Sequence, residues 1–211
     1  MGVGLEGLEL PRTIRTREGL FNTECVLPAE QIQRRVDQMG QELAERYSGR
    51  GAIHMLVVLN GAMHFASDLM RAAQRVNPDL DITADHVRAS SYAGRQSSGV
   101  IRLQCTPSDS LADKHVLVVE DIVDSGLTLD WLIPSLRAHH PASLEVAAAV
   151  VKNNPARAEN ILGGTALHAG FELGNDFVIG YGLDIDQQYR HLDSVYKVTP
   201  VTADVLATAA L

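Results

Sequence analysis

The sequence predicts an α/β protein in which a twisted parallel sheet is flanked by helices and a small hood lies over the carboxyl edge of the sheet. Segments of strand length alternate with segments of helical periodicity along most of the 211 residues. Three strand-length runs, residues 53–59, 116–119 and 144–151, are almost entirely apolar, which is typical of parallel strands covered on both faces. The last part of the chain is irregular and has few helical patterns, so we expect it to form the hood.

The N-terminal part of the chain predicts an arm and a helix. Residues 1–22 hold several glycines and a proline, and we expect an arm with little regular structure. Pro28 opens a helix over residues 29–47, which has acidic residues near its start. The Ser-Gly-Arg-Gly run at residues 48–51 then ends this helix.

The next two predicted strands enclose an amphipathic helix. After the strand at residues 53–59, apolar residues at helical spacing predict a helix over residues 65–76, which an Asn-Pro pair ends. Residues 80–91 alternate between apolar and polar and predict another strand. A long polar segment follows at residues 92–110, and connections of this length inside compact domains are usually functional.

The second half of the chain continues the alternation and then becomes irregular. The strands at residues 116–119 and 144–151 are separated by a helix over residues 129–140, in which Pro134 predicts a kink or a late start. The remaining predicted segments are an irregular one at 153–164 and short strands at 177–182 and 195–198.

A chain of this length suits one domain with small appendages. We assign residues 1–22 to the N-terminal arm, residues 23–200 to the domain and residues 201–211 to a C-terminal tail. The hood consists of about residues 153–200 together with the N-terminal segment.

Composition excludes several classes of protein. The net charge is −8 and the pI is near 5.4, so no basic surface indicates nucleic-acid binding. The two cysteines lack metal-ligand spacing and suit a reducing compartment. No apolar run has the length of a membrane span, and no leader pattern precedes the arm. We therefore expect a cytoplasmic protein with neither a nucleic-acid nor a membrane partner.

The most distinctive chemistry lies where the strand at residues 116–119 gives way to the following helix. Glu120 and Asp121 follow the strand, and Asp124 precedes a Ser-Gly turn. Ligands of open α/β sheets bind at the carboxyl ends of strands, and the N–H groups that begin a helix suit a phosphate. Because carboxylates accept hydrogen bonds from vicinal hydroxyls, this order of residues predicts a site for a phosphorylated ribose.

Residues 116–128 closely resemble the signature of type I phosphoribosyltransferases, in which an apolar strand and two acids precede Asp-Ser/Thr-Gly-x-Thr. The resemblance implies that Glu120 and Asp121 hold the ribose hydroxyls of phosphoribosyl pyrophosphate (PRPP) and that the turn cradles its 5′-phosphate. Asp124 directly precedes the phosphate turn and can face the base, so we expect it to be the catalytic residue that meets the N7 proton of a purine, as general base or as hydrogen-bond partner. The implied PRPP-binding residues are Glu120, Asp121, Asp124, Ser125, Gly126, Leu127 and Thr128.

A longer stretch, from about residue 51 to residue 200, resembles the hypoxanthine-guanine phosphoribosyltransferase branch. The run Leu-Asn-Gly-Ala at residues 59–62 is similar to the family's pyrophosphate loop, which can hold a non-proline cis peptide, here before Asn60. Many relatives carry lysine at the position of Asn60. Ser91 and Tyr92 resemble the start of the mobile loop that closes over the reacting centre. The implied pyrophosphate-binding residues are Asn60, Gly61 and Arg190.

The same resemblance supplies a purine pocket and a metal. Lys152 matches a lysine whose ammonium, a donor only, selects the 6-oxo group of the base. Phe177 would stack on the purine, and Val178 would offer backbone groups to its edge. Magnesium, which prefers carboxylate and phosphate oxygens, is the implied cofactor. The implied purine-binding residues are Lys152, Phe177, Val178 and Asp184, and the implied metal ligands are Asp184, Glu120 and Asp121.

These features predict a purine salvage enzyme that transfers the 5-phosphoribosyl group from PRPP to N9 of hypoxanthine or guanine, giving IMP or GMP and pyrophosphate. A homodimer or homotetramer is expected. Two alternatives stay open. One is a xanthine phosphoribosyltransferase, because Lys152 and Phe177 do not separate the oxopurines. The other is a PRPP-binding regulatory protein on the same fold, which a salt-dependent affinity for nucleic acid would indicate.

Overall fold

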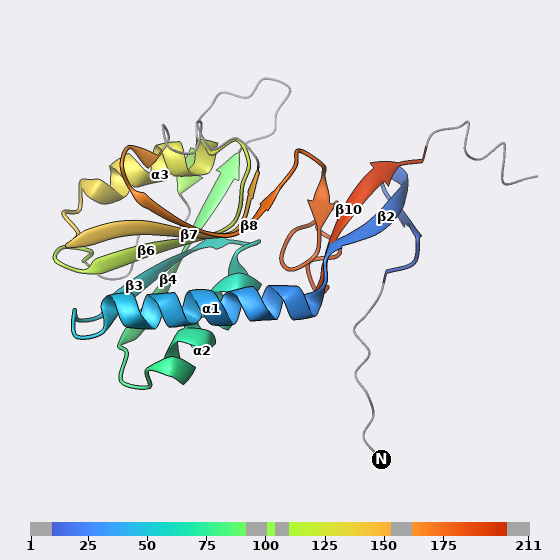
Figure 1. The fold of residues 1–211 in the computed structure, drawn as a ribbon. Coiled ribbons are helices and arrows are strands. Elements are labelled where there is room, and N and C mark those ends of the chain that lie inside the picture. Colours follow the sequence, from blue (N-terminus) through green and yellow to red (C-terminus); the bar gives the residue numbers. More distant parts are fainter. Residues whose placement is uncertain (1–9, 92–100, 104–109, 153–161, 202–211) are drawn as a thin grey trace, which may run out of the picture. The chain divides into compact units, whose positions relative to one another are not determined.

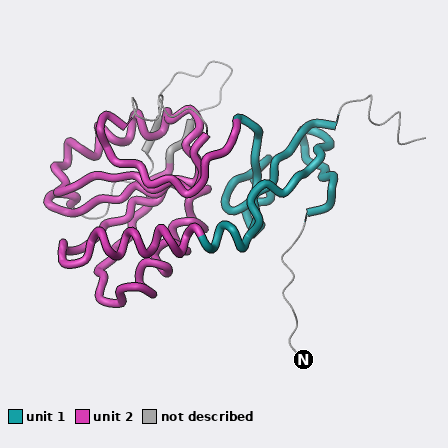
Figure 2. Tube along the Cα trace, in the orientation of Figure 1, with its two compact units in different colours: residues 1–34, 175–211 teal, residues 35–174 magenta. Residues whose placement is uncertain are grey.

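The computed structural model describes residues 10–91, 101–103, 110–152 and 162–201 (Figure 1). The chain divides into two compact units (Figure 2). Residues 35–174 form the larger unit, and residues 1–34 together with 175–211 form the smaller one. In the described ranges, no helix combines the length and apolar character needed to cross a membrane.

The larger unit is built on a six-stranded sheet with the order β5-β4-β3-β6-β7-β8 (Figure 1). Five of its strands, β4, β3, β6, β7 and β8, run parallel to one another. The edge strand β5 runs antiparallel to β4. The strands are β3 Ile53–Leu59, β4 Ile82–Ser91, β5 Ile101–Leu103, β6 His115–Val123, β7 Ser143–Lys152 and β8 Ala166–Leu173.

Helices cover both faces of this sheet (Figure 1). Helices α1, Ala29–Tyr47, and α2, Met63–Val76, lie on one face, and α3, Leu127–Arg137, lies on the other. Helix α1 begins in the smaller unit and continues into the larger one. The core on the α3 side joins the leucines and isoleucine of that helix to valines of β3, β6 and β7. On the other face α1 and α2 approach so closely that a Cβ at Gly40 would overlap Ala72.

The strand order creates a switch point between β3 and β6. After β3 the chain forms β4 on one side of it, and later it returns to form β6 on the other side. The connections therefore diverge at the carboxyl ends of β3 and β6, which leaves a crevice where open α/β sheets bind ligands. Two of the sequence-predicted groups lie at these ends: Asn60 and Gly61 follow β3, and Glu120 and Asp121 lie near the carboxyl end of β6.

The smaller unit contains an antiparallel sheet with the order β1-β2-β10-β9. Its strands are β1 Thr13–Thr16, β2 Gly19–Leu27, β9 Val178–Ile179 and β10 Val195–Pro200. The unit has a core of its own, so its side chains do not depend on the larger sheet for burial. That core consists of Ile14, Phe21, Ile179, Ile185, Leu192, Tyr196 and Val198.

The predicted fold class is confirmed, but the expected arm is wrong in part. Residues 13–16 form β1 and residues 19–22 form the beginning of β2, because β1 pairs with β2 and β2 pairs in turn with β10, which satisfies their backbone groups. Strand β8 was not expected, since its residues are only partly buried and show weak alternation. Residues 166–173, which were predicted to belong to the hood, therefore form an edge strand of the larger sheet.

Several predicted boundaries also differ. Strand β6 is longer than the predicted run at 116–119 and includes both acids, because β7 pairs with it as far as Val123. Helix α3 begins at Leu127, runs through Pro134 and ends at Arg137, whereas the prediction was 129–140. The strand expected at 177–182 is reduced to β9, since left-handed glycines at 180 and 182 break the extended backbone.

Candidate functional site

The carboxyl ends of β3 and β6 meet at Gly61. A Cβ at Gly61 would overlap the carboxylate of Asp121, so only glycine allows the two strand ends to approach this closely. The expected cis peptide between Leu59 and Asn60 is confirmed. The loop after β3 and the acids of β6 are therefore brought together by direct contact within the larger unit.

Glu120 is the most unusual carboxyl group of this edge. Its side chain is buried, with the residue only 6% exposed, and its Oε2 atom has no hydrogen-bond partner among the described residues. Burial, and then the neighbouring Asp121 carboxylate, raise the pKa of Glu120 well above its usual value. A buried acceptor without a donor is costly, so Glu120 suits a ligand that brings hydroxyl groups or a cation.

The raised pKa of Glu120 predicts that replacing its carboxyl group by an uncharged one stabilises the folded protein. Because the folded-state pKa lies above the unfolded value, the folded protein loses stability as the pH rises through the folded pKa. Glu120→Gln should therefore raise the free energy of unfolding by about 1–3 kcal/mol at alkaline pH. The difference should shrink in acid, where the native carboxyl is protonated.

Thermal unfolding of both proteins across a pH series measures this effect. Glu172→Gln, which changes an exposed glutamate of β8, is the matched control and should leave unfolding unchanged. Equal melting temperatures for Glu120→Gln and the native protein at every pH would contradict the cost assigned to the buried carboxylate.

A cavity of about 230 Å³ follows the acids at the start of α3. Gly126 precedes the helix with φ of 72°, a left-handed conformation that glycine adopts freely, and no side chain caps the helix. The first N–H groups of α3 have no partners within the helix, so they are available to an anion. The cavity is lined by residues 120–129, which include Asp124, Ser125, Leu127 and Thr128.

The exposed side chains of this turn differ in their contribution. Leu127 is 61% exposed, and its backbone N–H donates to Oγ of Ser125 over 3.5 Å. Asp124 is also exposed and lies directly before the turn. A carboxylate in that position can contact a ligand seated over the turn.

Lys152 is the last residue of β7, the strand next to β6. The register pairs Val123 with Val151, so Lys152 and Asp124 occupy the next positions along the neighbouring strand ends. The Lys152 residue is only 5% exposed. Because a buried ammonium must be paired or hydrogen-bonded, this lysine is held as part of the strand end rather than solvated.

In the smaller unit, Val178 begins the edge strand β9 and Phe177 directly precedes it. Phe177 is 55% exposed, which is unusual for a large aromatic side chain. Its carbonyl accepts a hydrogen bond from Val198 N–H at 3.0 Å. Since bonding alternates along an antiparallel pair, the N–H and C=O of Val178 point away from β10 toward the open edge.

Asp184 and Arg190 bind each other in the smaller unit. Nη2 of Arg190 lies 2.6 Å from Oδ1 of Asp184, and Gln187 N–H donates to Oδ2 over 2.8 Å. Arg190 also donates to the carbonyl of Gly182. The segment from 180 to 190 contains several non-glycine residues with left-handed backbone, which is common in ligand-binding loops.

The carboxylates of each unit can be judged as metal ligands. Over the described ranges, no group of three His, Cys, Asp or Glu side chains is arranged to hold a metal ion. Magnesium typically takes one or two carboxylates and completes its shell with phosphate oxygens and water. Glu120 and Asp121, with a buried oxygen that lacks a partner, fit such a shell.

Two predicted loop residues lie at or beyond the limit of the described residues, and one contact of the loop after β3 was not predicted. Ser91 is the last residue of β4. Tyr92 lies outside the described residues, as does most of the expected mobile loop, of which residues 101–103 form β5. Arg88, near the end of β4, donates from Nη2 to Oδ1 of Asn60 over 3.0 Å. Nothing in the local sequence distinguishes Arg88 from an ordinary exposed arginine, because the contact depends on the pairing of β3 with β4.

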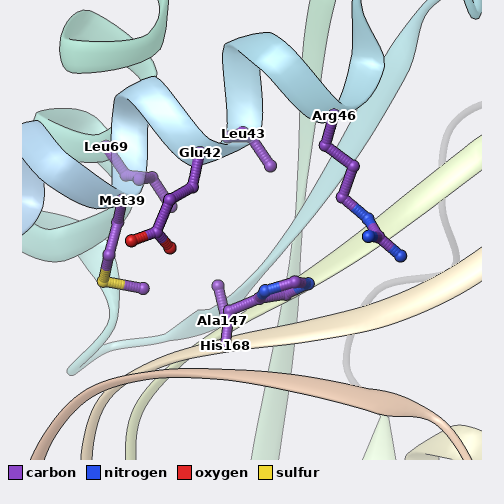
Figure 3. A pocket seen from close by; sticks show the side chains of 7 residues that line it. All are labelled: Met39, Glu42, Leu43, Arg46, Leu69, Ala147 and His168. Carbon is purple, nitrogen blue, oxygen red and sulfur yellow. The ribbon is translucent and has the colours of Figure 1, made fainter.

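A second cavity, of about 260 Å³, lies elsewhere in the larger unit (Figure 3). Arg46 and His168 both bind the buried carboxylate of Glu145, at 2.5 and 2.7 Å. Burial alone would raise the pKa of Glu145, but these hydrogen bonds outweigh it and lower the pKa. These three polar groups therefore satisfy one another. The cavity is lined by Met39, Glu42, Leu43, Arg46, Leu69, Ala147 and His168, none of which is a predicted site residue.

Comparisons with known proteins agree on one family. The family model of the phosphoribosyl transferase domain matches residues 23–184. The hypoxanthine-guanine phosphoribosyltransferase of Mycobacterium avium is 38% identical over 83% of this chain and 85% of its own length. The hypoxanthine-guanine-xanthine phosphoribosyltransferase of Tritrichomonas foetus is 34% identical over 77% of this chain and 84% of its own. The crystal structure of the Trypanosoma cruzi hypoxanthine phosphoribosyltransferase matches with a TM-score of 0.73 and 30% identity, covering 84% of this chain and 97% of that one.

Proposed function

The chain belongs to the hypoxanthine-guanine phosphoribosyltransferase family, and from this premise we propose which residues bind its substrates and carry its reaction. Its function is that of a purine salvage phosphoribosyltransferase. We propose that it transfers the 5-phosphoribosyl group from PRPP to N9 of hypoxanthine or guanine, releasing pyrophosphate. The observation that carries the assignment of the site is the buried, unpartnered carboxylate of Glu120 beside Asp121, next to an uncapped helix start.

PRPP binding is divided between the acids and the turn. We assign the ribose hydroxyls to Glu120 and Asp121, because a hydroxyl supplies the donor that the Glu120 oxygen lacks. The 5′-phosphate lies over residues 125–128, where helix N–H groups and the hydroxyls of Ser125 and Thr128 can donate. Gly61 and its neighbours contact the pyrophosphate through backbone N–H groups.

Magnesium is the proposed cofactor. Glu120 and Asp121 would hold it together with oxygens of PRPP, and the ion would neutralise charge that develops on the departing pyrophosphate. Asp184 was predicted as a further ligand. Arg190 and Gln187 each engage one oxygen of Asp184, and each oxygen keeps a second lone pair with which it would bind the ion.

The purine base is recognised by hydrogen bonds to its edge and by an aromatic ring that stacks on its face. The ammonium of Lys152 donates to the 6-oxo oxygen, and it would leave the 6-amino group of adenine without an acceptor. Phe177 stacks on the ring, and the outward N–H and C=O of Val178 bind its edge. Asp124 accepts the N7 proton as N9 attacks the anomeric carbon, which keeps the purine nucleophilic.

A panel of bases tests this function. The protein is mixed with PRPP, Mg²⁺ and hypoxanthine, guanine, xanthine or adenine in turn, and nucleotide formation is followed by chromatography. We expect IMP and GMP, and no product from adenine. Faster turnover of xanthine would favour the alternative that the T. foetus relative's name suggests. Tight PRPP binding without product from any base would favour a regulatory protein.

Two further expectations belong to the same proposal. We expect the enzyme to work in the cytoplasm and to assemble as a homodimer or homotetramer. Sedimentation analysis of the full chain measures the assembly directly, and a monomer at working concentration would contradict it.

A further inference from the structure

A hydrogen bond between two exposed side chains joins the carboxyl ends of β3 and β4. Nη2 of Arg88 donates to Oδ1 of Asn60 over 3.0 Å. Arg88 pairs in register with Leu59, the residue that precedes Asn60, so the contact spans adjacent strand ends. Both residues are exposed. Solvent-exposed polar pairs contribute little to stability, so this one is open to a second role.

The chemistry of the pair fixes the direction of the Asn60 amide. A guanidinium carries only hydrogen-bond donors, so it must meet the carbonyl oxygen of the amide rather than its nitrogen. The NH₂ group of Asn60 therefore points away from Arg88. Two N–H donors of the amide and the remaining donors of the guanidinium are left beside the loop at Asn60 and Gly61.

The charge of Arg88 matters because this edge is otherwise acidic. The Asp121 carboxylate packs against Gly61, and Glu120 precedes it in β6. An anion over the loop would meet these carboxylates at short range, where like charges repel. Arg88 brings a full positive charge to the β4 side of the same loop, opposite in sign to the acids on its β6 side.

We propose that Asn60 and Arg88 act as one diphosphate-binding pair. Asn60 donates from its amide nitrogen to the diphosphate of PRPP, and Arg88 is the positioning residue that orients this amide and supplies the compensating charge. This inference rests on the proposed function, because PRPP is the diphosphate ester that the larger unit would bind.

Three ligands of graded structure test the pair by calorimetry on the full chain with Mg²⁺. PRPP carries a ribose, a 5′-phosphate and a diphosphate. Ribose 5-phosphate lacks the diphosphate, and inorganic pyrophosphate is the diphosphate alone. Arg88→Ala should weaken PRPP and pyrophosphate about tenfold, as expected for the loss of a charge-assisted contact, and leave ribose 5-phosphate unchanged. Asn60→Asp keeps the acceptor for Arg88 but places a carboxylate where the amide donated, so it should weaken PRPP still more.

A rescue variant and a control variant distinguish the specific role of Arg88 from the loss of any exposed positive charge. Asn60→Lys in the Arg88→Ala background should restore PRPP affinity, because one lysine supplies both donor and charge. Arg75→Ala is the control. It removes an exposed arginine from the last turn of α2, where Arg75 pairs with Asp37, and should change none of the three affinities.

Each other outcome counts against a specific claim. Native PRPP affinity in Arg88→Ala would overturn the inference and leave the proposed function intact. An equal loss for ribose 5-phosphate would overturn it too, since the effect would then be structural. If the native protein bound neither PRPP nor ribose 5-phosphate, the proposed function itself would fail.

Discussion

Asp124→Asn should lower kcat by about 10²–10⁴-fold, the usual contribution of a positioned general acid or base. Asp124 is exposed, lines the cavity before α3 and occupies the strand end next to Lys152. An amide of the same shape still contacts a ligand over the turn but does not take up a proton. PRPP affinity should therefore change far less than turnover. Steady-state kinetics and calorimetry with PRPP measure the two quantities separately.

The neighbouring acid Asp130 provides a matched control. It lies in the first turn of α3 and is exposed, so Asp130→Asn makes the same chemical change close to the same helix end. Its turnover should stay at the native level. Normal turnover in Asp124→Asn would sink the assignment of Asp124 as the group that accepts the N7 proton.

Lys152→Ala should weaken binding of hypoxanthine and guanine by about 10- to 100-fold, which corresponds to the loss of a hydrogen bond to a charged donor. The residue ends β7 and is nearly inaccessible to solvent, so a bound 6-oxo group would lose a donor that water does not easily replace. PRPP affinity should persist, because the acids and the phosphate turn are unchanged. Base affinity is measured by calorimetry in the presence of PRPP.

Two comparisons show whether this effect is specific. Lys152→Met, which keeps most of the side-chain volume, should lose as much oxopurine affinity as Lys152→Ala. Lys114→Ala, next to the opposite end of β6, should lose none. If Lys152→Ala bound hypoxanthine as tightly as the native protein, the selection of the 6-oxo group would have to come from other residues.

Glu120 shows why a binding edge lowers the stability of the free protein. Its carboxylate is buried beside another acid, and its raised pKa reflects the cost of the charged form. A ligand hydroxyl or a metal ion would remove this cost on binding, so part of the binding free energy comes from relief of the buried charge. The predicted stabilisation by Glu120→Gln and this part of the binding free energy therefore have the same cause.

Much of the fold was predictable because its central strands are locally unambiguous. Runs such as Val-Leu-Val-Val at 116–119 are apolar at every position, a pattern that a parallel strand under two helical layers requires. Strand β8 and the hairpin of β1 and β2 were missed for the opposite reason. Their residues are partly exposed, and their stability depends on pairing with distant strands.

The sequence by itself determined the central strands, the helices between them and the family, because these depend on local periodicity and on an ordered run of acids, glycine and hydroxyl residues. Only the tertiary structure decided that Glu120 is buried without a partner, that Gly61 packs against Asp121 and that Arg88 holds Asn60. Each of these depends on which strands are neighbours and in what register. Strand pairing joins residues far apart in the chain, so it leaves no local signal at the positions it brings into contact.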